Sequence, residues 1–187
     1  MKLAHVFLAF LAVSAVSVAT AEFEEVSIWD ALSASKEHTV LTETLDFLGL
    51  AEVLGETNLT LTLLSPTDLA FDIFFKALGL EGNVSTILNA FNIDALAEVI
   101  GYHFLVDAIP LEYILDNNNK TIKEHTLAGN VTVHLFENHS DGAAWVKGRT
   151  GESMLREWTA SEQPYPSFLY PVDKVLLPRK YSDFPGY

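Results

Sequence analysis

Three histidines in the second half of the chain are of a type that could bind a metal ion. His125, His134 and His139 are separated by nine and then five positions. Zinc sites in proteins combine His and Cys at characteristic short spacings. The chain has no Cys and no His-Glu-x-x-His motif. The pattern therefore predicts no metal site, and we expect His134 on a strand and His139 in a turn to face solvent.

Two further motifs have only part of a functional pattern. The run from Asp116 to Lys120 begins like an EF-hand calcium loop, but Lys120 stands where an oxygen ligand is required and no glycine follows it. Ser153 lies in Gly-Glu-Ser-Met, which is not the Gly-x-Ser-x-Gly elbow of an α/β-hydrolase. We therefore expect no enzyme activity and no cofactor.

The adjacent pair Tyr102 and His103 has polar tips within an apolar stretch. The pair follows an apolar helical pattern and precedes Phe104-Leu-Val106. Polar groups in such surroundings need hydrogen-bond partners. Two hypotheses follow for this binding or structural motif. The pair contacts a ligand or partner, or His103 is buried and bonds to the backbone at a junction between a helix and a strand near 101–103.

The elements around this pair begin with a strand that changes into a helix. Leucine alternates with threonine from Leu59 to Leu63, which predicts a strand over 59–64. Ser65 is a good N-cap and Pro66 suits the first helical position, so we expect a helix to begin there and to end at Gly79. Its residues are apolar around most of the circumference, which predicts burial on several sides.

The remaining elements place helices before strands. This order favours an α+β fold over alternating βαβ units. We expect helices over 26–38 and 39–48, a helix over 87–91 capped by Ser85, a helix over 93–100 capped by Asn92, strands over 131–135, 143–147 and 168–178, and a long loop over 148–166 with a short helix at 154–158.

The first residues have the pattern of a secretory signal peptide. A basic start is followed by a mostly apolar run from Leu3 to Val18 and by the small residues of Ala19-Thr-Ala21. We expect cleavage after Ala21, secretion to the extracellular space and no direct membrane insertion. The expected organisation is a signal peptide over 1–21 and one domain of 166 residues over 22–187, with its core at about 26–179 and a short tail at 180–187.

The chain is strongly acidic. Its formal net charge is −14, and it becomes −15 when Lys2 is removed with the signal peptide. This charge disfavours nucleic acids and anionic membrane surfaces as partners. The acidic residues are dispersed, which is typical of a solvated surface rather than a calcium or mineral tract. Without Cys, stability has to come from an apolar core, to which the large side chains of a sequence with twelve Phe and three Trp can contribute.

Asn-x-Ser/Thr sequons indicate N-glycosylation of a secreted chain. Each sequon marks a candidate surface loop or strand edge. The five acceptor residues are Asn58, Asn83, Asn119, Asn130 and Asn138.

Three separated stretches together resemble the fasciclin (FAS1) domain. Thr62 to Phe71, Gly101 to Leu105 and Tyr170 to Pro178 are similar to the family's first conserved box, its Tyr-His motif and its second conserved box, in the family's order. The stretch from Thr126 to Val133 also resembles the strand that leads into the family's central hairpin. The resemblance covers about Val26 to Arg179.

The resemblance implies an α+β fold of FAS1 type, a wedge-shaped β-sandwich with the N-terminal and inserted helices packed at one side. Within it, we expect the 59–64 strand to pair with Val172 to Leu177. The resemblance also implies adhesion or matrix association without catalysis. The chain departs from the family in having Pro166-Ser-Phe-Leu-Tyr-Pro171 where an Asn-Gly turn and a histidine are frequent, and it has no Arg-Gly-Asp tripeptide.

Two functional hypotheses follow from these patterns. The leading one is a secreted glycoprotein that acts in extracellular cell adhesion or matrix association by binding matrix or cell-surface proteins or glycans. One binding site cannot bridge two surfaces, so adhesion by this chain needs weak self-association or an array partner. The alternative is a soluble extracellular carrier that holds a small apolar ligand between the helices and the wedge, near Trp145, Trp158 and Tyr165.

Overall fold

The chain places its helices first and most of its strands last. The structure is a computed structural model that describes residues 25–116, 120–129, 131–159, 161 and 163–180. The expected signal peptide, Asn119, Asn130 and most of the C-terminal tail lie outside these residues. In chain order the elements are α1 (Ile28–Ala34), α2 (Thr39–Phe47), α3 (Ala51–Leu54), β1 (Thr62–Pro66), α4 (Asp68–Ala77), α5 (Val84–Ala90), α6 (Ile93–Gly101), β2 (Phe104–Leu105), α7 (Leu111–Leu115), β3 (Ile122–His125), β4 (Thr132–Asn138), β5 (Ala143–Lys147), β6 (Glu152–Met154) and β7 (Phe168–Val172).

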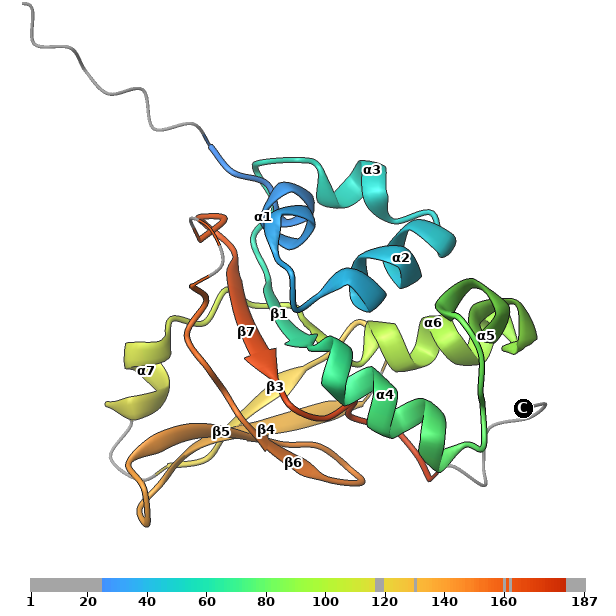
Figure 1. Cartoon of the computed structure of the whole chain (residues 1–187). Helices are drawn as coiled ribbons and strands as arrows, with labels where there is room; N and C mark the ends of the chain where they lie inside the picture. The colour runs from blue at the N-terminus through green and yellow to red at the C-terminus, as the bar shows by residue number, and fades with distance from the viewer. Residues whose placement is uncertain (1–24, 117–119, 130, 160, 162, 181–187) are drawn as a thin grey trace, which may run out of the picture.

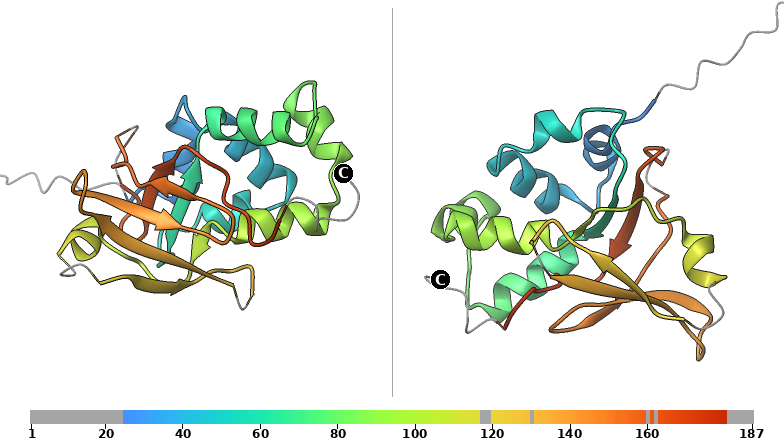
Figure 2. Two further views of the ribbon diagram at one scale, coloured as in Figure 1. Left: turned by 90° about the horizontal axis from the view of Figure 1, so that it is seen from below. Right: turned by 180° about the vertical axis from the view of Figure 1, so that it is seen from behind.

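Two sheets and a group of helices form the body of the molecule. A three-stranded sheet in the order β2-β1-β7 lies between the helices and a four-stranded sheet in the order β3-β4-β5-β6 (Figure 1). The views from below and from behind show α1 to α6 gathered on one side of this sandwich (Figure 2). The fold is therefore the expected α+β arrangement, with α1 to α6 packed at one side, whereas α7 packs against β4 and β5.

β1 is the centre of this arrangement because both of its faces are buried. Successive side chains of a strand point to opposite faces. Leu63 lies in the apolar cluster shared with the helices, whereas Leu64 lies in the cluster that contacts the four-stranded sheet. All five residues of β1 are buried. One short strand thus joins the two halves of the core.

Segments about a hundred residues apart meet along β1 and β7, which pair in parallel. The register places Thr62 opposite Phe168 and Pro66 opposite Val172. The expected pairing of β1 with the C-terminal apolar run is confirmed, but the partner strand is Phe168–Val172 rather than 172–177. β7 ends early because the backbone N–H of Asp173 leaves the sheet and donates to the Ser153 hydroxyl at 3.1 Å.

The predicted start of the helix after β1 was wrong by two residues. Thr67, not Ser65, is the N-cap of α4, and its hydroxyl accepts from the N–H of Ala70 at 3.3 Å. Ser65 and Pro66 stay extended because they pair with β7, and the N–H of Thr67 donates to Val172 O at 3.1 Å. The buried Ser65 hydroxyl has no hydrogen-bond partner among the described residues. Long-range pairing therefore overrides the local capping signal.

α4 is buried along one face only. Leu69 and Ile73 are 63% and 54% exposed, so the expectation of burial on several sides was wrong. Phe71, Phe74 and Phe75 supply the buried face. The helix lies at the outside of the fold, and the core covers only part of its apolar surface. It ends as expected at Gly79, which has a positive φ of 69°.

Two further local predictions, the N-cap of α5 and a helix at 154–158, were wrong. Asn83, not Ser85, caps α5, because its Oδ1 accepts the Thr86 N–H at 2.8 Å. The segment 154–158 is not a helix. Its first residue belongs to β6, which pairs with β5, and the N–H of Leu155 continues this contact by donating to Ala144 O at 2.8 Å.

Other elements agree with the sequence patterns. The helix expected over 39–48 is α2, and the strand expected over 143–147 is β5. Asn92 caps α6 by accepting from the N–H groups of Asp94 and Ala95. The helix gives way to a strand at 101–104, as expected. Among the described residues no single helix is long and apolar enough to cross a membrane, and the α5–α6 pair that reaches that length is bent by 109°.

Candidate functional site

Tyr102 and His103 lie at the centre of the fold, where α6 ends and β2 begins. Tyr102 is the C-cap of α6, and both side chains have an exposed fraction of 0%. α6 is strongly amphipathic, and its apolar face packs in the core. The two residues that follow its last turn therefore lie inside the core before β2 begins. Neither side chain therefore reaches the surface that a macromolecular partner would contact.

His103 connects the end of α6 to the last segment of the core. Its Nε2 accepts the backbone N–H of Leu176 at 2.9 Å, and its Nδ1 lies 2.8 Å from Val99 O. An imidazole nitrogen that accepts a hydrogen bond carries no proton, so the proton is on Nδ1, which donates to Val99. Burial lowers the pKa of His103 to about 4, against the raising effect of the Val99 bond. The side chain is therefore neutral at neutral pH.

Tyr102 connects α6 to the start of β4 and to the turn between β5 and β6. Its hydroxyl donates to Thr132 O at 3.2 Å and accepts the N–H of Arg149 at 3.0 Å. Gly148 lies so close to the ring that a Cβ there would be 3.2 Å from the hydroxyl oxygen. Burial raises the pKa of Tyr102, so the phenol stays protonated and able to donate.

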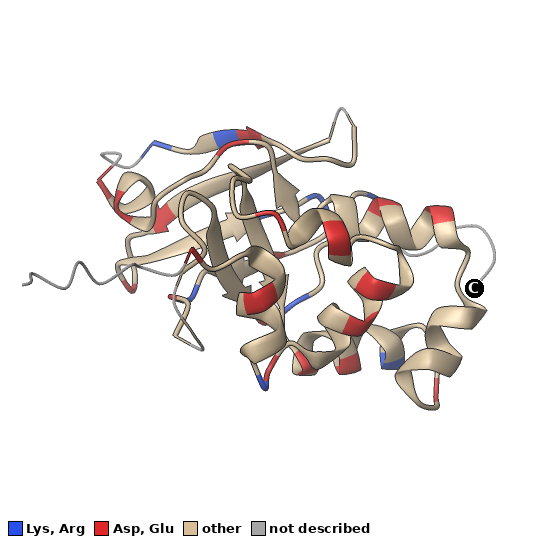
Figure 3. Cartoon of the chain, turned by 90° about the horizontal axis from the view of Figure 1, so that it is seen from above, with Lys and Arg blue, Asp and Glu red and all other residues tan. Residues whose placement is uncertain are grey.

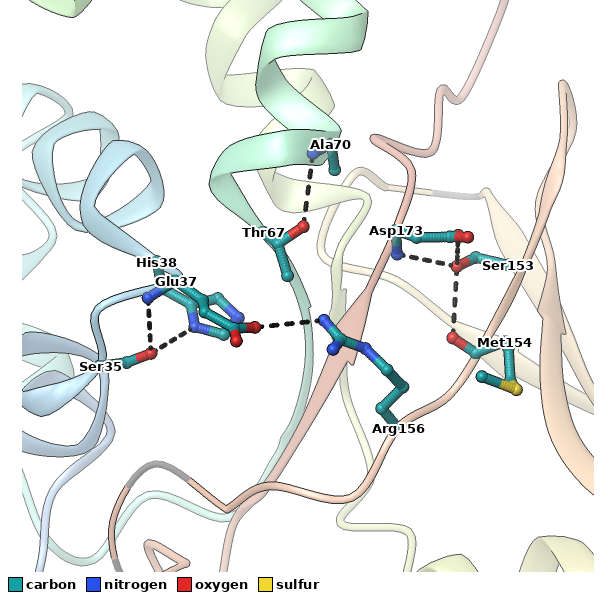
Figure 4. A network of polar contacts seen from close by, with 9 residues as sticks. All are labelled: Ser35, Glu37, His38, Thr67, Ala70, Ser153, Met154, Arg156 and Asp173. Atoms are coloured by element: carbon teal, nitrogen blue, oxygen red, sulfur yellow. Dashed lines mark hydrogen bonds and ion pairs between the residues drawn. The ribbon is translucent and has the colours of Figure 1, made fainter.

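Further polar contacts, which the sequence patterns did not reveal, lie around the α1–α2 turn and around the end of β7 (Figure 4). Ser35 Oγ lies 2.7 Å from His38 Nδ1, and Glu37 contacts Arg156 at 3.5 Å. Ser153 donates to Asp173 Oδ1 at 2.5 Å. The Arg156 and Asp173 contacts join residues far apart in sequence, and no local motif marks them.

The Ser35–His38 pair has the residue types of a catalytic dyad but a different setting. Ser35 and His38 are 5% and 2% exposed, and the imidazole packs against the ring of Trp158 at a centroid distance of 5.0 Å. Burial lowers the pKa of His38. Ser35 Oγ also accepts the N–H of Glu37 at 3.3 Å, as a turn-stabilising serine does. The Ser35 contacts thus stabilise the turn before α2, and the Ser35 hydroxyl oxygen is occupied by a backbone N–H.

An apolar cavity lies between α3, α6 and the segment that leads into β1. Its volume is about 550 Å³, and its lining includes Leu54, Leu59, Leu61, Ala97 and Ile100. The cavity therefore lies where a pocket between the helices and the wedge was expected.

The aromatic residues that suggested a pocket lie elsewhere. Trp145 donates its indole N–H to Asp141, Trp158 donates to Ser161, and Tyr165 is 77% exposed. None of the three is among the residues that line the apolar cavity. The expectation about the place of these aromatic side chains was therefore wrong, although a cavity exists.

The histidines of the second half do not gather around a common point. Within the described part of the chain, no group of three or more His, Asp or Glu side chains could hold a metal ion. His134 on β4 and His139 in the turn after it are exposed, as expected.

Most of the chain matches a known protein family. The fasciclin domain model matches residues 36–178. The chain belongs to the fasciclin domain family. The matched residues include both conserved boxes and the Tyr-His motif, so the resemblance in the sequence is confirmed.

A solved structure supports the fasciclin fold. The FAS1 domain pair from the insect cell adhesion molecule fasciclin I is similar with a TM-score of 0.51 and 16% sequence identity. The similarity covers 76% of this chain and 44% of that one, so this fasciclin domain spans less than half of the pair. No curated protein matches the chain.

Within this fasciclin domain, the described sequon residues lie at or near the surface. Asn58 and Asn83 are exposed, and Asn138 is half-buried at the end of β4. Asn83 Oδ1 is engaged in capping α5, which leaves its Nδ2, the atom that carries a glycan, outside that bond. Asn119 and Asn130 fall outside the described residues.

Proposed function

We propose that this chain is a secreted, glycosylated fasciclin domain that acts in extracellular cell adhesion or matrix association. Membership of the fasciclin family, shown by the match over residues 36–178, is the observation that carries the proposal. The solved neighbour comes from a cell adhesion molecule, and the signal-peptide pattern and the sequons fit an extracellular setting. The role requires binding rather than catalysis.

The charge of the surface restricts the chemistry of the partner. The segment that forms α1, α2 and α3 carries exposed carboxylates, and Figure 3 shows few Lys or Arg among them. Such a surface attracts basic protein surfaces and repels sulfated glycans. The partner we propose is therefore a matrix or cell-surface protein with a basic patch. The carboxylates in question are Glu25, Asp30, Glu37, Glu43, Asp46, Glu52 and Glu56.

Adhesion also needs more than one attachment point. A single weak site gives little retention, whereas linked sites raise the overall avidity by orders of magnitude. The solved neighbour contains a pair of FAS1 domains, and this chain spans 44% of it. We therefore propose that the domain works through weak self-association or by display on an array.

The proposal is tested with protein secreted from eukaryotic cells, so that its signal peptide and glycans are processed. Cell attachment is measured on surfaces coated with the monomeric protein and with the protein coupled to a multivalent scaffold. Attachment that rises with valency and falls with added salt supports the proposal. If the folded protein retains no more cells than an uncoated surface in either form, the proposal is wrong.

A further inference from the structure

The apolar cavity at the helical side of the molecule has no part in the adhesion proposal. It lies between α3, α6 and the segment 59–61, and its volume of about 550 Å³ falls within the range of roughly 300–1,000 Å³ that small-molecule sites occupy. Its floor includes Leu54, Ile100 and Phe104, which are at most 4% exposed and belong to the helical core. The cavity therefore borders directly on the buried core of the fold.

The wall of the cavity is suited to hydrocarbon. Among the described residues that line it, Asp94 alone is charged, and the others are aliphatic, glycine or phenylalanine. Two N–H groups of the first turn of α6 are already engaged, because Asn92 Oδ1 accepts from those of Asp94 and Ala95. A ligand with several polar groups would lose its hydration there without gaining hydrogen bonds. The wall thus selects for an apolar ligand.

The mouth of the cavity is also apolar. Val53, Ile93 and Leu127 line it while remaining 55%, 54% and 59% exposed. These three residues come from α3, α6 and the turn after β3, yet they surround one opening. Contiguous exposed apolar residues around a concavity mark binding surfaces. The turn that carries Leu127 approaches α6 closely at Gly101. A Cβ at Gly101 would be only 3.4 Å from the backbone N of Ala128 in that turn.

Charge argues against a second copy and against an anionic ligand at this opening. A second copy would bring together two chains with a formal net charge of −14 each. The Asp94 carboxylate is exposed beside the opening and repels an anionic head group. Asn58, an exposed sequon residue, directly precedes the lining residue Leu59, so a glycan there would hinder a macromolecule more than a small molecule.

We propose that this cavity binds a neutral, predominantly hydrocarbon small molecule. The ligand enters past Val53, Ile93 and Leu127 and packs against the leucines of the segment 59–61 and against α6. A chain that binds such a molecule in the extracellular space would keep it in aqueous solution. This activity is independent of adhesion.

The test uses the neutral fluorescent probe N-phenyl-1-naphthylamine, whose emission rises in an apolar site. Ala97 is exposed on α6 and lines the cavity, so Ala97→Phe places an aromatic ring in the cavity without disturbing the core. Ala77 is exposed at the end of α4 and does not line the cavity, so Ala77→Phe is the matched control. We expect Ala97→Phe to weaken probe binding by at least about tenfold and Ala77→Phe to leave it unchanged.

A competition experiment tests the preference for a neutral ligand. Dodecanol should displace the probe at a concentration about fivefold lower than laurate, and Asp94→Asn should reduce that difference.

If Ala97→Phe fails to fold, Val53→Glu at the exposed mouth provides the second variant, and it should also weaken binding. Absence of probe binding to the folded wild type, or equal binding by Ala97→Phe, would overturn the proposal. So would a dimer in sedimentation that Ala97→Phe dissociates, because the cavity would then be an interface between copies. Cell attachment by these variants, measured in parallel, distinguishes failure here from failure of the adhesion proposal.

Discussion

The imidazole Nε2 of His103 accepts the backbone N–H of Leu176 at 2.9 Å across 73 positions of sequence. The same ring donates through Nδ1 to Val99 O in the last turn of α6. One buried side chain thereby joins a helix in the middle of the chain to the segment that follows β7. The Tyr-His motif of this fasciclin domain therefore has contacts that stabilise the fold.

Removal of the His103 ring should destabilise the fold. We expect His103→Ala to lower the free energy of unfolding by about 3 kcal/mol, because it leaves the Leu176 N–H without a partner and creates a cavity. His134→Ala, at an exposed position of β4, should change it by less than about 0.5 kcal/mol. Urea unfolding followed by circular dichroism measures both. Equal stability of the two variants would contradict the role given to His103.

Acid should weaken the fold through the same residue. The folded-state pKa of His103 is about 4, below its ordinary value of 6.5, so the unfolded chain binds a proton between these values while the folded protein does not. Stability is therefore fully present above about pH 6.5 and falls as the pH drops toward 4, by up to about 3 kcal/mol. Burial also lowers the pKa of His38, which acts in the same direction.

The measurement is unfolding free energy against pH for the wild type and for His103→Gln. The variant should lose less stability than the wild type between pH 6.5 and 4, because glutamine does not titrate. Parallel curves for the two proteins would show that His103 is not the group responsible.

The Tyr102 hydroxyl should also contribute to stability. Tyr102→Phe removes the bonds to Thr132 O and to the Arg149 N–H, and we expect a loss of about 1–3 kcal/mol. Tyr113→Phe is the matched control, because Tyr113 is 56% exposed on α7. Thermal unfolding should show a lower Tm for Tyr102→Phe only. A Tm equal to that of the control would exclude an energetic role for the two hydroxyl bonds.

Asp68 at the start of α4 caps a different helix. Its carboxylate accepts the Val40 N–H at 2.8 Å and the Thr39 hydroxyl at 2.7 Å, whereas His38, the N-cap residue of α2, makes no capping bond with its side chain. We expect Asp68→Ala to cost about 1–2 kcal/mol. Asp72→Ala on the same helix removes only the exposed ion pair with Lys76 and should cost less than about 0.5 kcal/mol. Chemical denaturation compares the two, and the reverse order would contradict this assignment.

The sequence patterns were sufficient wherever the determining contacts are local. Asn92 was correctly predicted to cap α6, because the N–H groups that it binds lie two and three residues away. The start of α4 was misplaced because Ser65 and Pro66 pair with a strand about a hundred residues later in the chain. A capping pattern contains no information about such a partner.

The candidate sites were predictable to a similar extent. Tyr102 and His103 could be selected from the sequence, but the choice between ligand contact and structure depended on Thr132, Arg149 and Leu176, which are distant in sequence. A pocket between the helices and the wedge was expected, but its lining residues were not, because three separated segments form its wall and ordinary core leucines line it. The Ser153–Asp173 contact was missed for the same reason.

The most direct test of the adhesion proposal is the binding rate of the glycosylated, secreted domain to immobilised matrix and cell-surface proteins. We compare the wild type with a double charge reversal of exposed carboxylates on α2 and α3, Asp46→Lys with Glu52→Lys, which we call the α2–α3 variant. The control is a double charge reversal elsewhere, Glu81→Lys with Glu112→Lys. All four positions are exposed. We expect the α2–α3 variant to lose at least about tenfold in association rate at low salt, while the control pair retains most of it. Equal effects of the two pairs, or no binding by the folded wild type, would contradict the proposal.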